Sequence, residues 1–351
     1  MTPTLSQLAD VLGKFSDLSP QLQAERCLNQ RHRRAGGCAA CQEACPCGAI
    51  TLRGAPQIEQ GACLGCDACA AACPVGALEG RRHPLTVWRE ACQDARDGVA
   101  TLACRALGAG RFAATRIPCV GALAPEFYVA LAAAGVRQVV LHTAGCESCP
   151  LAEGLPQAEQ AIDTASAFLE RLGLALTVTH KVGAPAAAAV ARTAVSRRNF
   201  LTAAFRDRTQ QAASTDRLDA YMAAGVGWRR ALLLEALARL PVPAGAALPT
   251  QERLWGALTV GEACVGCQMC ARFCPTEALA ATADSDGQVT LWLDAARCTA
   301  CGLCERVCFK QAIRLSDEVS LSALAHSRYV PLWQGHPPQN ALKSKVKQAS
   351  R

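Results

Sequence analysis

Residues 264–275 read Cys-Val-Gly-Cys-Gln-Met-Cys-Ala-Arg-Phe-Cys-Pro, and residues 298–308 read Cys-Thr-Ala-Cys-Gly-Leu-Cys-Glu-Arg-Val-Cys. Both stretches follow the spacing C-x2-C-x2-C-x3-C. Three thiolates two residues apart lie on a tight loop that can wrap one face of an iron–sulfur cubane, and a fourth must arrive from elsewhere. A zinc ribbon is the alternative, but it needs only paired C-x2-C, so two consecutive four-cysteine runs disfavour it.

This pattern resembles the bacterial dicluster ferredoxins, in which the fourth cysteine of each run binds the cluster of the other run. The resemblance covers about residues 260–316 and implies one 4Fe–4S cluster on Cys264, Cys267, Cys270 and Cys308. It implies a second cluster on Cys298, Cys301, Cys304 and Cys274. It also implies two antiparallel β-hairpins and two short helices, in a module so small that the clusters hold it together.

A second, altered copy of the motif lies near the N-terminus, at about residues 27–80. A full run occupies Cys63, Cys66, Cys69 and Cys73, and the last three positions of another run are Cys38, Cys41 and Cys45. Ala35 stands at the missing first position, so we expect Cys27 to supply the thiolate across the basic loop 29–37.

The dicluster resemblance then implies two N-terminal clusters. One is expected on Cys27, Cys38, Cys41 and Cys73, and the other on Cys63, Cys66, Cys69 and Cys45. Cys47 as the substitute ligand and a three-iron cluster remain as alternatives. After the fourth cysteine of each run, an Ala-Ile or Ala-Leu pair leads into a short strand, such as Ile50-Thr51-Leu52 or Ile313-Arg314-Leu315.

The periodicity changes between the two modules. Short apolar runs predict strands at 99–104, 113–119, 136–143 and 174–182, and amphipathic runs predict helices at 125–134 and 155–172. Strands that alternate with helices favour a small parallel α/β sheet. Four cysteines follow the first three strands, at the sheet edge where ligands usually bind, so we expect their sulfurs to converge: Cys104, Cys119, Cys146 and Cys149.

About residues 96–183 resemble the delta subunit of methyl-viologen-reducing hydrogenase, which docks on heterodisulfide reductase. The matching features are Arg116-Ile-Pro-Cys119-Val-Gly, the helix at Pro125 and Gly145-Cys146-Glu-Ser-Cys149. The resemblance implies a 2Fe–2S cluster on the four central cysteines, although Cys104 stands where that family has tandem cysteines. Structural thiols, or a redox dithiol at Cys146 and Cys149, are the alternatives.

The rest of the chain carries weaker signals. Ser196-Arg197-Arg198-Asn199-Phe200-Leu201 matches a twin-arginine export motif and resembles a stretch before the clusters of accessory ferredoxins of the nitrate-reductase type. Because no apolar segment follows it, we expect a basic helix start capped by Ser196. Residues 228–240 predict an amphipathic helix that packs on the α/β domain. Cys47, Cys92 and His142 are expected to have no ligand role.

These patterns predict an α+β protein with two ferredoxin-like dicluster modules flanking a small α/β domain and a helical linker. The expected division is an N-terminal helical segment 1–26, a module 27–83, the α/β domain 84–190, the linker 191–258, a module 259–318 and a basic tail 319–351.

Length, charge and hydropathy narrow the class further. The chain has 351 residues, 22 cysteines and a formal net charge of +7. It contains no apolar run of about 18 residues that would predict a membrane span, and its first residues do not read as a secretory signal. Because the cysteine spacings are those of metal ligands rather than of a disulfide framework, we expect a reducing cytoplasm.

Basic residues gather at 26–34 and 343–351. No aromatic interleaving accompanies them, so we expect no nucleic-acid partner. Solvated surface, or a face that docks an acidic redox partner, fits them better.

The function expected from these patterns is one-electron transfer along about four 4Fe–4S clusters, with a 2Fe–2S cluster in the middle domain. No G-x-G-x-x-G fingerprint and no Ser–His–Asp motif occurs, so we expect no bond chemistry of its own. The chain would serve a larger oxidoreductase of the formate dehydrogenase, hydrogenase or molybdoenzyme type. An accessory or maturation factor for a metalloenzyme is the alternative.

Overall fold

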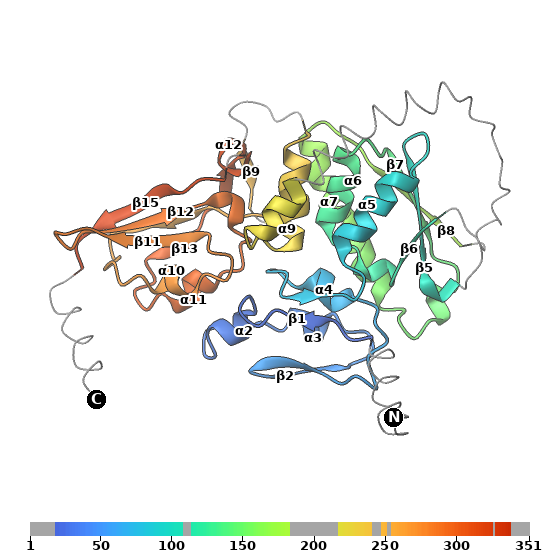
Figure 1. Cartoon of the computed structure of the whole chain (residues 1–351), viewed down its shortest axis with the longest axis horizontal. Coiled ribbons are helices and arrows are strands. Elements are labelled where there is room, and N and C mark those ends of the chain that lie inside the picture. Colours follow the sequence, from blue (N-terminus) through green and yellow to red (C-terminus); the bar gives the residue numbers. More distant parts are fainter. Residues whose placement is uncertain are drawn as a thin grey trace, which may run out of the picture.

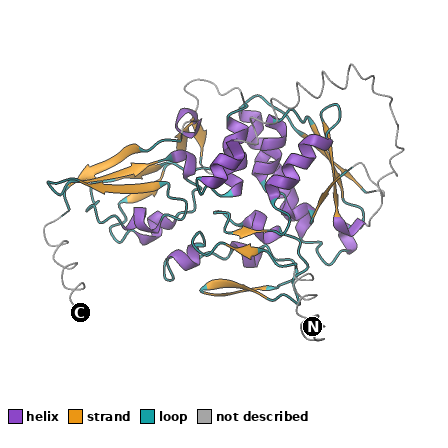
Figure 2. Ribbon diagram, in the orientation of Figure 1, coloured by secondary structure: helices purple, strands orange, loops and turns teal. Residues whose placement is uncertain are grey.

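The computed structural model describes residues 18–107, 114–182, 217–240, 247–250, 254–325 and 327–337. The described residues form an N-terminal module, a central α/β region and a C-terminal module, which Figures 1 and 2 show around the helix α9 (Trp228–Leu237). This mixture of helix and sheet agrees with the predicted fold class. The motif at Ser196–Leu201 and the basic residues 343–351 lie outside the described residues.

The central region contains the predicted parallel sheet. Its four strands lie in the order β6-β5-β7-β8, and every neighbouring pair is parallel. The strands are β5 (Val99–Cys104), β6 (Thr115–Ile117), β7 (Gln138–His142) and β8 (Thr177–Lys181). Three helices gather on one side of the sheet in Figure 1: α5 (Pro84–Asp94), α6 (Pro125–Ala133) and α7 (Gly154–Arg171).

Helix α6 is the centre of the packing. The helix starts at Pro125, and proline is favoured at the first helical position because its fixed φ is already that of a helix. After the last turn the chain leaves the helix at Gly135, which has φ +91°. It is buried almost all round because α7 and α9 both pack against it. The amphipathic helix expected at residues 228–240 therefore does pack on the α/β domain.

Each ferredoxin-type module combines short helices with two small sheets. The N-terminal module contains β1 (Gln21–Leu22), α2 (Leu28–Arg31), α3 (Ala40–Glu43), β2 (Ile50–Arg53), β3 (Ala55–Ile58), α4 (Ala68–Ala72) and β4 (Leu78–Glu79). The C-terminal module contains β10 (Leu258–Val260), α10 (Met269–Phe273), β11 (Leu279–Ala283), β12 (Val289–Leu293), η4 (Ala295–Arg297), α11 (Leu303–Val307) and β13 (Ile313–Leu315).

The expectation of two hairpins in each module is wrong for the second sheet. β2–β3 and β11–β12 are hairpins, but β1 pairs with β4 and β10 pairs with β13. These second sheets therefore join the two ends of each module. The chain that enters and the chain that leaves are tied together, which closes each module around its cysteine loops.

The C-terminal module extends beyond the expected segment. β15 (Val330–Gly335) pairs with β12 and widens its sheet to three strands. β14 (Glu318–Ser320) pairs with β9 (Ala247–Pro249), and α12 (Leu321–Ala325) follows it. Part of the expected basic tail is thus ordered structure, as is a strand in the expected helical linker.

Candidate metal centres

Left-handed backbone positions shape the cysteine loops. In three of the four runs both neighbours of the second cysteine have φ between +51° and +70°; they are Gly65 and Asp67, Gly266 and Gln268, and Ala300 and Gly302. Residues other than glycine rarely adopt this conformation, so it marks a constrained loop. Such loops turn successive N–H groups toward one point and form an anion-binding nest.

Those N–H groups reach the sulfurs. Burial raises the pKa of Cys63, Cys264 and Cys298, and a hydrogen bond from the backbone N–H two residues later opposes the rise in each case. The fourth cysteines receive a hydrogen bond from the alanine four residues later. The Ala77 N–H lies 3.2 Å from Cys73 Sγ, and the Ala312 N–H lies 3.3 Å from Cys308 Sγ. At both positions the alanine side chain is buried, which favours a small residue there.

In the C-terminal module, two sets of thiols gather as the spacing predicts. The C-terminal outer set lines one cavity and consists of Cys264, Cys267, Cys270 and Cys308. Burial, reinforced by the other three thiols of this set, raises the pKa of Cys270 to about 12. The C-terminal junction set consists of Cys298, Cys301, Cys304 and Cys274. Burial raises the pKa of Cys304, and the other three thiols of this set add to the rise.

In the N-terminal module, the structure brings Cys27 together with three cysteines of the two runs. One cavity is lined by the N-terminal junction set, which consists of Cys27, Cys38, Cys41 and Cys73. Asn29 holds this arrangement: its Nδ2 donates to Cys38 O at 2.8 Å, and its Oδ1 accepts from Cys38 N at 3.0 Å. The side chain copies a backbone pair and fastens α2, which Cys27 caps, to the start of the truncated run.

Cys47 lies with a different set. Its Sγ is 3.7 Å from Cys45 Sγ, and Cys45 belongs to the N-terminal inner set of Cys63, Cys66, Cys69 and Cys45. Desolvation raises the pKa of Cys63 and Cys66, and both Cys45 and Cys47 add to the rise. This position places Cys47 away from the cavity that lacks a first-position cysteine, which disfavours it as the substitute ligand.

The central set of Cys104, Cys119, Cys146 and Cys149 converges at the carboxyl edge of the sheet. Cys104 ends β5, Cys119 follows β6, and the other two lie in the turn after β7. Burial raises the pKa of Cys146 to about 11, and the other three thiols add to the rise.

The loops of the central set resemble those of the ferredoxin-type runs. At both Cys119 and Cys149, the backbone N–H two residues later donates to the sulfur. The donor to Cys119 is Gly121, and the donor to Cys149 is Leu151, whose N lies 3.4 Å from the Sγ. Gly154 lies so close that a Cβ there would stand 3.0 Å from Cys119 Sγ. His142 is the buried last residue of β7, as the sequence predicts for an ordinary strand position.

The donor chemistry of the sets fits iron–sulfur clusters. All five sets consist of thiols, the usual ligands of iron–sulfur clusters, and two sets line cavities. Among the described residues, no three His, Cys, Asp or Glu side chains are grouped so that they could hold a single metal ion. Two further residues at these sets carry little signal in the sequence. Arg229 and Arg230, both on α9, donate to backbone carbonyls of the cysteine loops. Arg229 is 156 residues from its partner Cys73, and Arg230 is 68 residues from its partner Cys298.

Comparison with known proteins supports the two modules. The 4Fe-4S dicluster domain matches residues 19–77 and 263–312, which contain all the cysteines of the N-terminal and C-terminal sets. Neither a curated protein nor a solved structure matches the chain. The resemblance of the central region to a hydrogenase subunit has no support in these matches and stays a prediction. Within the described residues, no helix is long and apolar enough to cross a membrane.

Proposed function

We propose that the protein relays single electrons along a row of iron–sulfur centres. The N-terminal and C-terminal sets each hold a 4Fe–4S cluster, and the central set holds a 2Fe–2S cluster. The observation that carries this proposal is the order in which the five sets lie. Each set shares an apolar core with the next, so the chain offers one continuous route rather than separate ferredoxins.

The first half of the row joins the central set to the N-terminal module. Cys119 of the central set and Cys66 of the N-terminal inner set lie in the same apolar core, and a charge on Cys119 raises the pKa of Cys66. Cys69 of the inner set shares another core with Cys41 of the N-terminal junction set. The three centres would therefore be consecutive neighbours.

The second half crosses between the modules. Cys27 and Cys73 share an apolar core with Leu303 and Val307, against which Cys301 packs. The two C-terminal sets then share a core that contains Cys270, Cys274 and Cys298. This gives the order central, N-terminal inner, N-terminal junction, C-terminal junction and C-terminal outer.

The polypeptide contributes the cysteine ligands, an apolar lining that excludes water, and N–H groups that act electrostatically on the sulfurs. The clusters supply one-electron chemistry when bound. Thiols must lose their protons to bind iron, so cluster binding depends on pH. Because the unfolded chain has no preformed site, cluster binding also contributes to folding. The buried, apolar lining of the sets excludes water, and the loop N–H groups stabilise negative charge on sulfur by donating hydrogen bonds to it.

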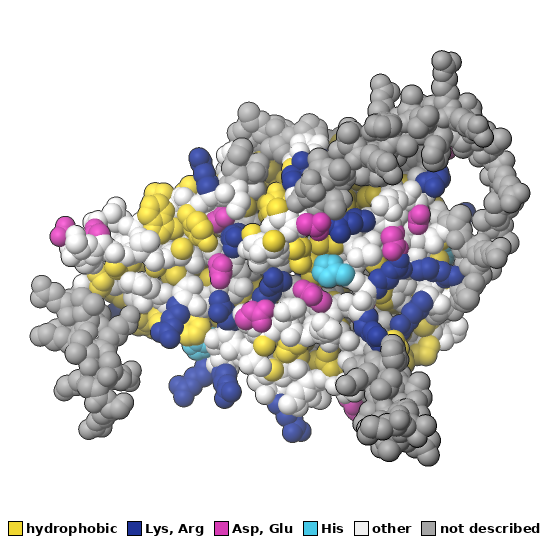
Figure 3. Space-filling model, in the orientation of Figure 1, with side chains coloured by type: hydrophobic (Ala, Val, Ile, Leu, Met, Phe, Trp, Pro, Cys, Tyr) yellow, Lys and Arg dark blue, Asp and Glu magenta, His cyan; other side chains and the backbone are white. Residues whose placement is uncertain are grey.

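A larger oxidoreductase fits as the partner, of the formate dehydrogenase, hydrogenase or molybdoenzyme type, because a row of centres needs a donor at one end and an acceptor at the other. Phe309 supports a docking face at the outer end. It follows Cys308 where the other runs have proline, and 66% of its surface is exposed. The face in Figure 3 carries basic side chains scattered among acidic and apolar ones.

The alternative of a maturation factor needs reactive thiolates. Reactive cysteines sit in exposed, electropositive surroundings that lower the pKa. Burial instead raises the pKa of Cys92 to about 12 and that of Cys146 to about 11, which favours the electron carrier. Stable, stoichiometric co-purification with a mature enzyme would support the carrier, and transient binding to an apo-enzyme would support the factor.

The test is iron and sulfide content together with EPR on anaerobically purified protein. Four cubanes and one 2Fe–2S centre predict about eighteen irons per chain. Dithionite should bleach the visible absorbance and produce spectra broadened by neighbouring spins. Zinc in place of iron, without reducible absorbance, would overturn the proposal.

A further inference from the structure

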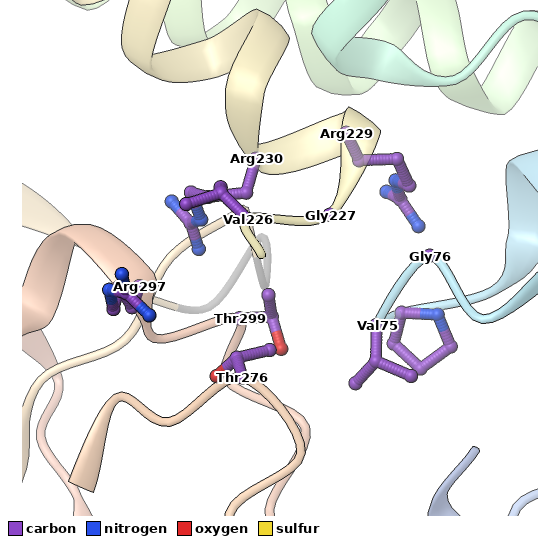
Figure 4. Close-up of a pocket in the computed structure, with 10 residues that line it drawn as sticks. Val75, Gly76, Val226, Gly227, Arg229, Arg230, Thr276, Arg297 and Thr299 are labelled. Atoms are coloured by element: carbon purple, nitrogen blue, oxygen red, sulfur yellow. The ribbon is translucent and has the colours of Figure 1, made fainter. Parts of the chain in front are cut away.

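Helix α9 begins with Trp228-Arg229-Arg230, and its two arginines reach opposite modules. Arg229 Nη1 donates to Cys73 O at 2.9 Å, and Arg230 Nη2 donates to Cys298 O. Cys73 belongs to the N-terminal junction set and Cys298 to the C-terminal junction set. Figure 4 shows Arg229 extending toward the Val75–Gly76 loop, while Arg230 extends to the other side. Consecutive residues of one helix thus touch both sides of the crossing between modules.

The two arginines differ in how their charge is balanced. The Nε of Arg229 lies 3.1 Å from both carboxylate oxygens of Glu126, and an Nη atom lies 3.0 Å from one of them. Glu126 is itself buried, so this pair carries no net charge at the N-terminal side of the crossing.

Arg230 has no such partner. It is 4% exposed, and among the described residues its Nε and Nη1 atoms have no hydrogen-bond partner. An arginine guanidinium is not deprotonated in proteins, so Arg230 carries a full positive charge, and the carboxylates that act on it electrostatically are Glu126 and Asp294. Asp294 is engaged elsewhere, by Ser327 Oγ at 2.6 Å and by Arg297 at 3.7 Å.

A buried cation interacts strongly with a charge close to it, because the interior has a low dielectric constant and salt screens buried charges little. The reduced form of a cluster carries one more negative charge than the oxidised form. A neighbouring positive charge therefore stabilises the reduced form and raises the reduction potential, as charge near a cluster is known to do. A neutral arginine–glutamate pair has a much smaller effect.

We propose that Arg230 raises the reduction potential of the cluster at the C-terminal junction set above that of the cluster at the N-terminal junction set. This inference rests on the proposed electron-transfer function and gives the crossing a direction. With both clusters bound, one electron would pass from the cluster held by the N-terminal junction set, which would be oxidised, to the cluster held by the C-terminal junction set, which would be reduced. No bond forms or breaks.

The experiment is an EPR-monitored redox titration of the full-length, cluster-loaded protein. Each junction signal is assigned by its loss or conversion in Cys38→Ser or in Cys301→Ser. In the wild-type protein, the C-terminal junction cluster should be reduced first. The reverse order, with full iron content, would overturn the inference without touching the proposed function, whereas absence of iron would refute both.

Variants separate charge from structure. Arg230→Gln should lower the reduced-to-oxidised ratio of the C-terminal junction cluster at least tenfold at a fixed potential, which is a shift of about 59 mV for a one-electron couple. Arg230→Lys should keep most of the wild-type value. The matched control Arg229→Gln/Glu126→Gln removes a neutral pair and should shift either cluster much less. Equal shifts in Arg230→Gln and Arg230→Lys would contradict the inference, and if Arg230→Gln does not load, the wild-type order decides.

Discussion

Cys27 and Cys47 both lie near the truncated cysteine run, but they lie at different thiol sets. Cys27 lines the cavity of the N-terminal junction set, and Cys47 lies beside Cys45 of the inner set. We expect Cys27→Ser to remove one cubane, or to convert it to a three-iron cluster with its own EPR signal. Cys47→Ser is the matched control and should keep the full iron content.

Iron analysis and EPR of the two variants decide the matter. Loss of iron in Cys47→Ser but not in Cys27→Ser would show that Cys47 supplies the missing ligand. The hydrogen bonds between Asn29 and Cys38 would then have another role. The spacing of the cysteines predicted the runs, because ligand loops are local in sequence, whereas the exchange of the fourth cysteines between runs was implied by the dicluster resemblance. Asn29 could not be recognised in this way, since its role depends on how α2 folds back on residue 38.

At the scale of elements, β15 covers one of the cysteine loops. Gly266 has φ +61°, and a Cβ there would stand 3.2 Å from the ring of Trp333 on β15. Gly266→Ala should therefore combine backbone strain with a clash against the loop that carries the C-terminal outer set. We expect iron to be released to a chelator several-fold faster than from the wild-type protein.

Gly287→Ala is the matched control for this change. Gly287 also has a positive φ, +78°, but nothing lies within 4 Å of an added Cβ. It should cost about 1 kcal/mol of stability through strain alone and leave the rate of iron release unchanged. Equal rates in the two variants would show that the contact with Trp333 does not support the loop.

The success of prediction differed between elements for a physical reason. Strands β5 and β7 and helices α6 and α7 were predicted to within a few residues, because the periodicity of their apolar residues is local. β9, β14 and β15 were not foreseen. β9 and β14 have only three residues each, and all three strands form because a partner from a distant segment pairs with them. The prediction of a second hairpin in each module was wrong for the same reason, since β1 pairs with β4 and β10 pairs with β13, far along the chain.

At the scale of the whole molecule, the central set is fastened to its neighbours. Gln157 on α7 donates to Ala68 O at 2.9 Å, beside the N-terminal inner set, and α9 covers α6. A test of the central centre therefore belongs in the full chain. We expect Cys119→Ser to lose about two irons while the signals of the four cubanes remain.

Cys92→Ser is the control for the central centre, because Cys92 is partly buried against the same core but lies outside the set. It should lose no iron. Wild-type protein in which all four central thiols react freely with a thiol reagent, and in which Cys119→Ser changes no metal content, would show that they are structural. The convergence of these cysteines was predictable from the parallel sheet, whereas the apolar core that Cys119 shares with Cys66 was not, since it depends on how two domains pack.

The crossing between modules is held by arginines from both sides. Arg31 Nη2 donates to Cys274 O at 2.7 Å, and Arg306 donates to Ala35 O at 2.7 Å and to Gly36 O at 3.1 Å. Removing both side chains leaves three carbonyls without these donors, so the modules should separate more readily. We expect Arg31→Ala/Arg306→Ala to keep its iron but to lose the EPR spin–spin interaction between the two junction clusters.

Electron passage from the N-terminal to the C-terminal module should slow in the same variant, because transfer depends steeply on the separation of the clusters. Arg314→Ala is a suitable control, since Arg314 is exposed on β13, away from the crossing. Unchanged spin coupling in the double variant would mean that the apolar contacts around Leu303 and Val307 hold the modules together without the arginines. Lost coupling with full iron content would show that the row of centres depends on a polar clamp between two otherwise complete ferredoxin-type modules.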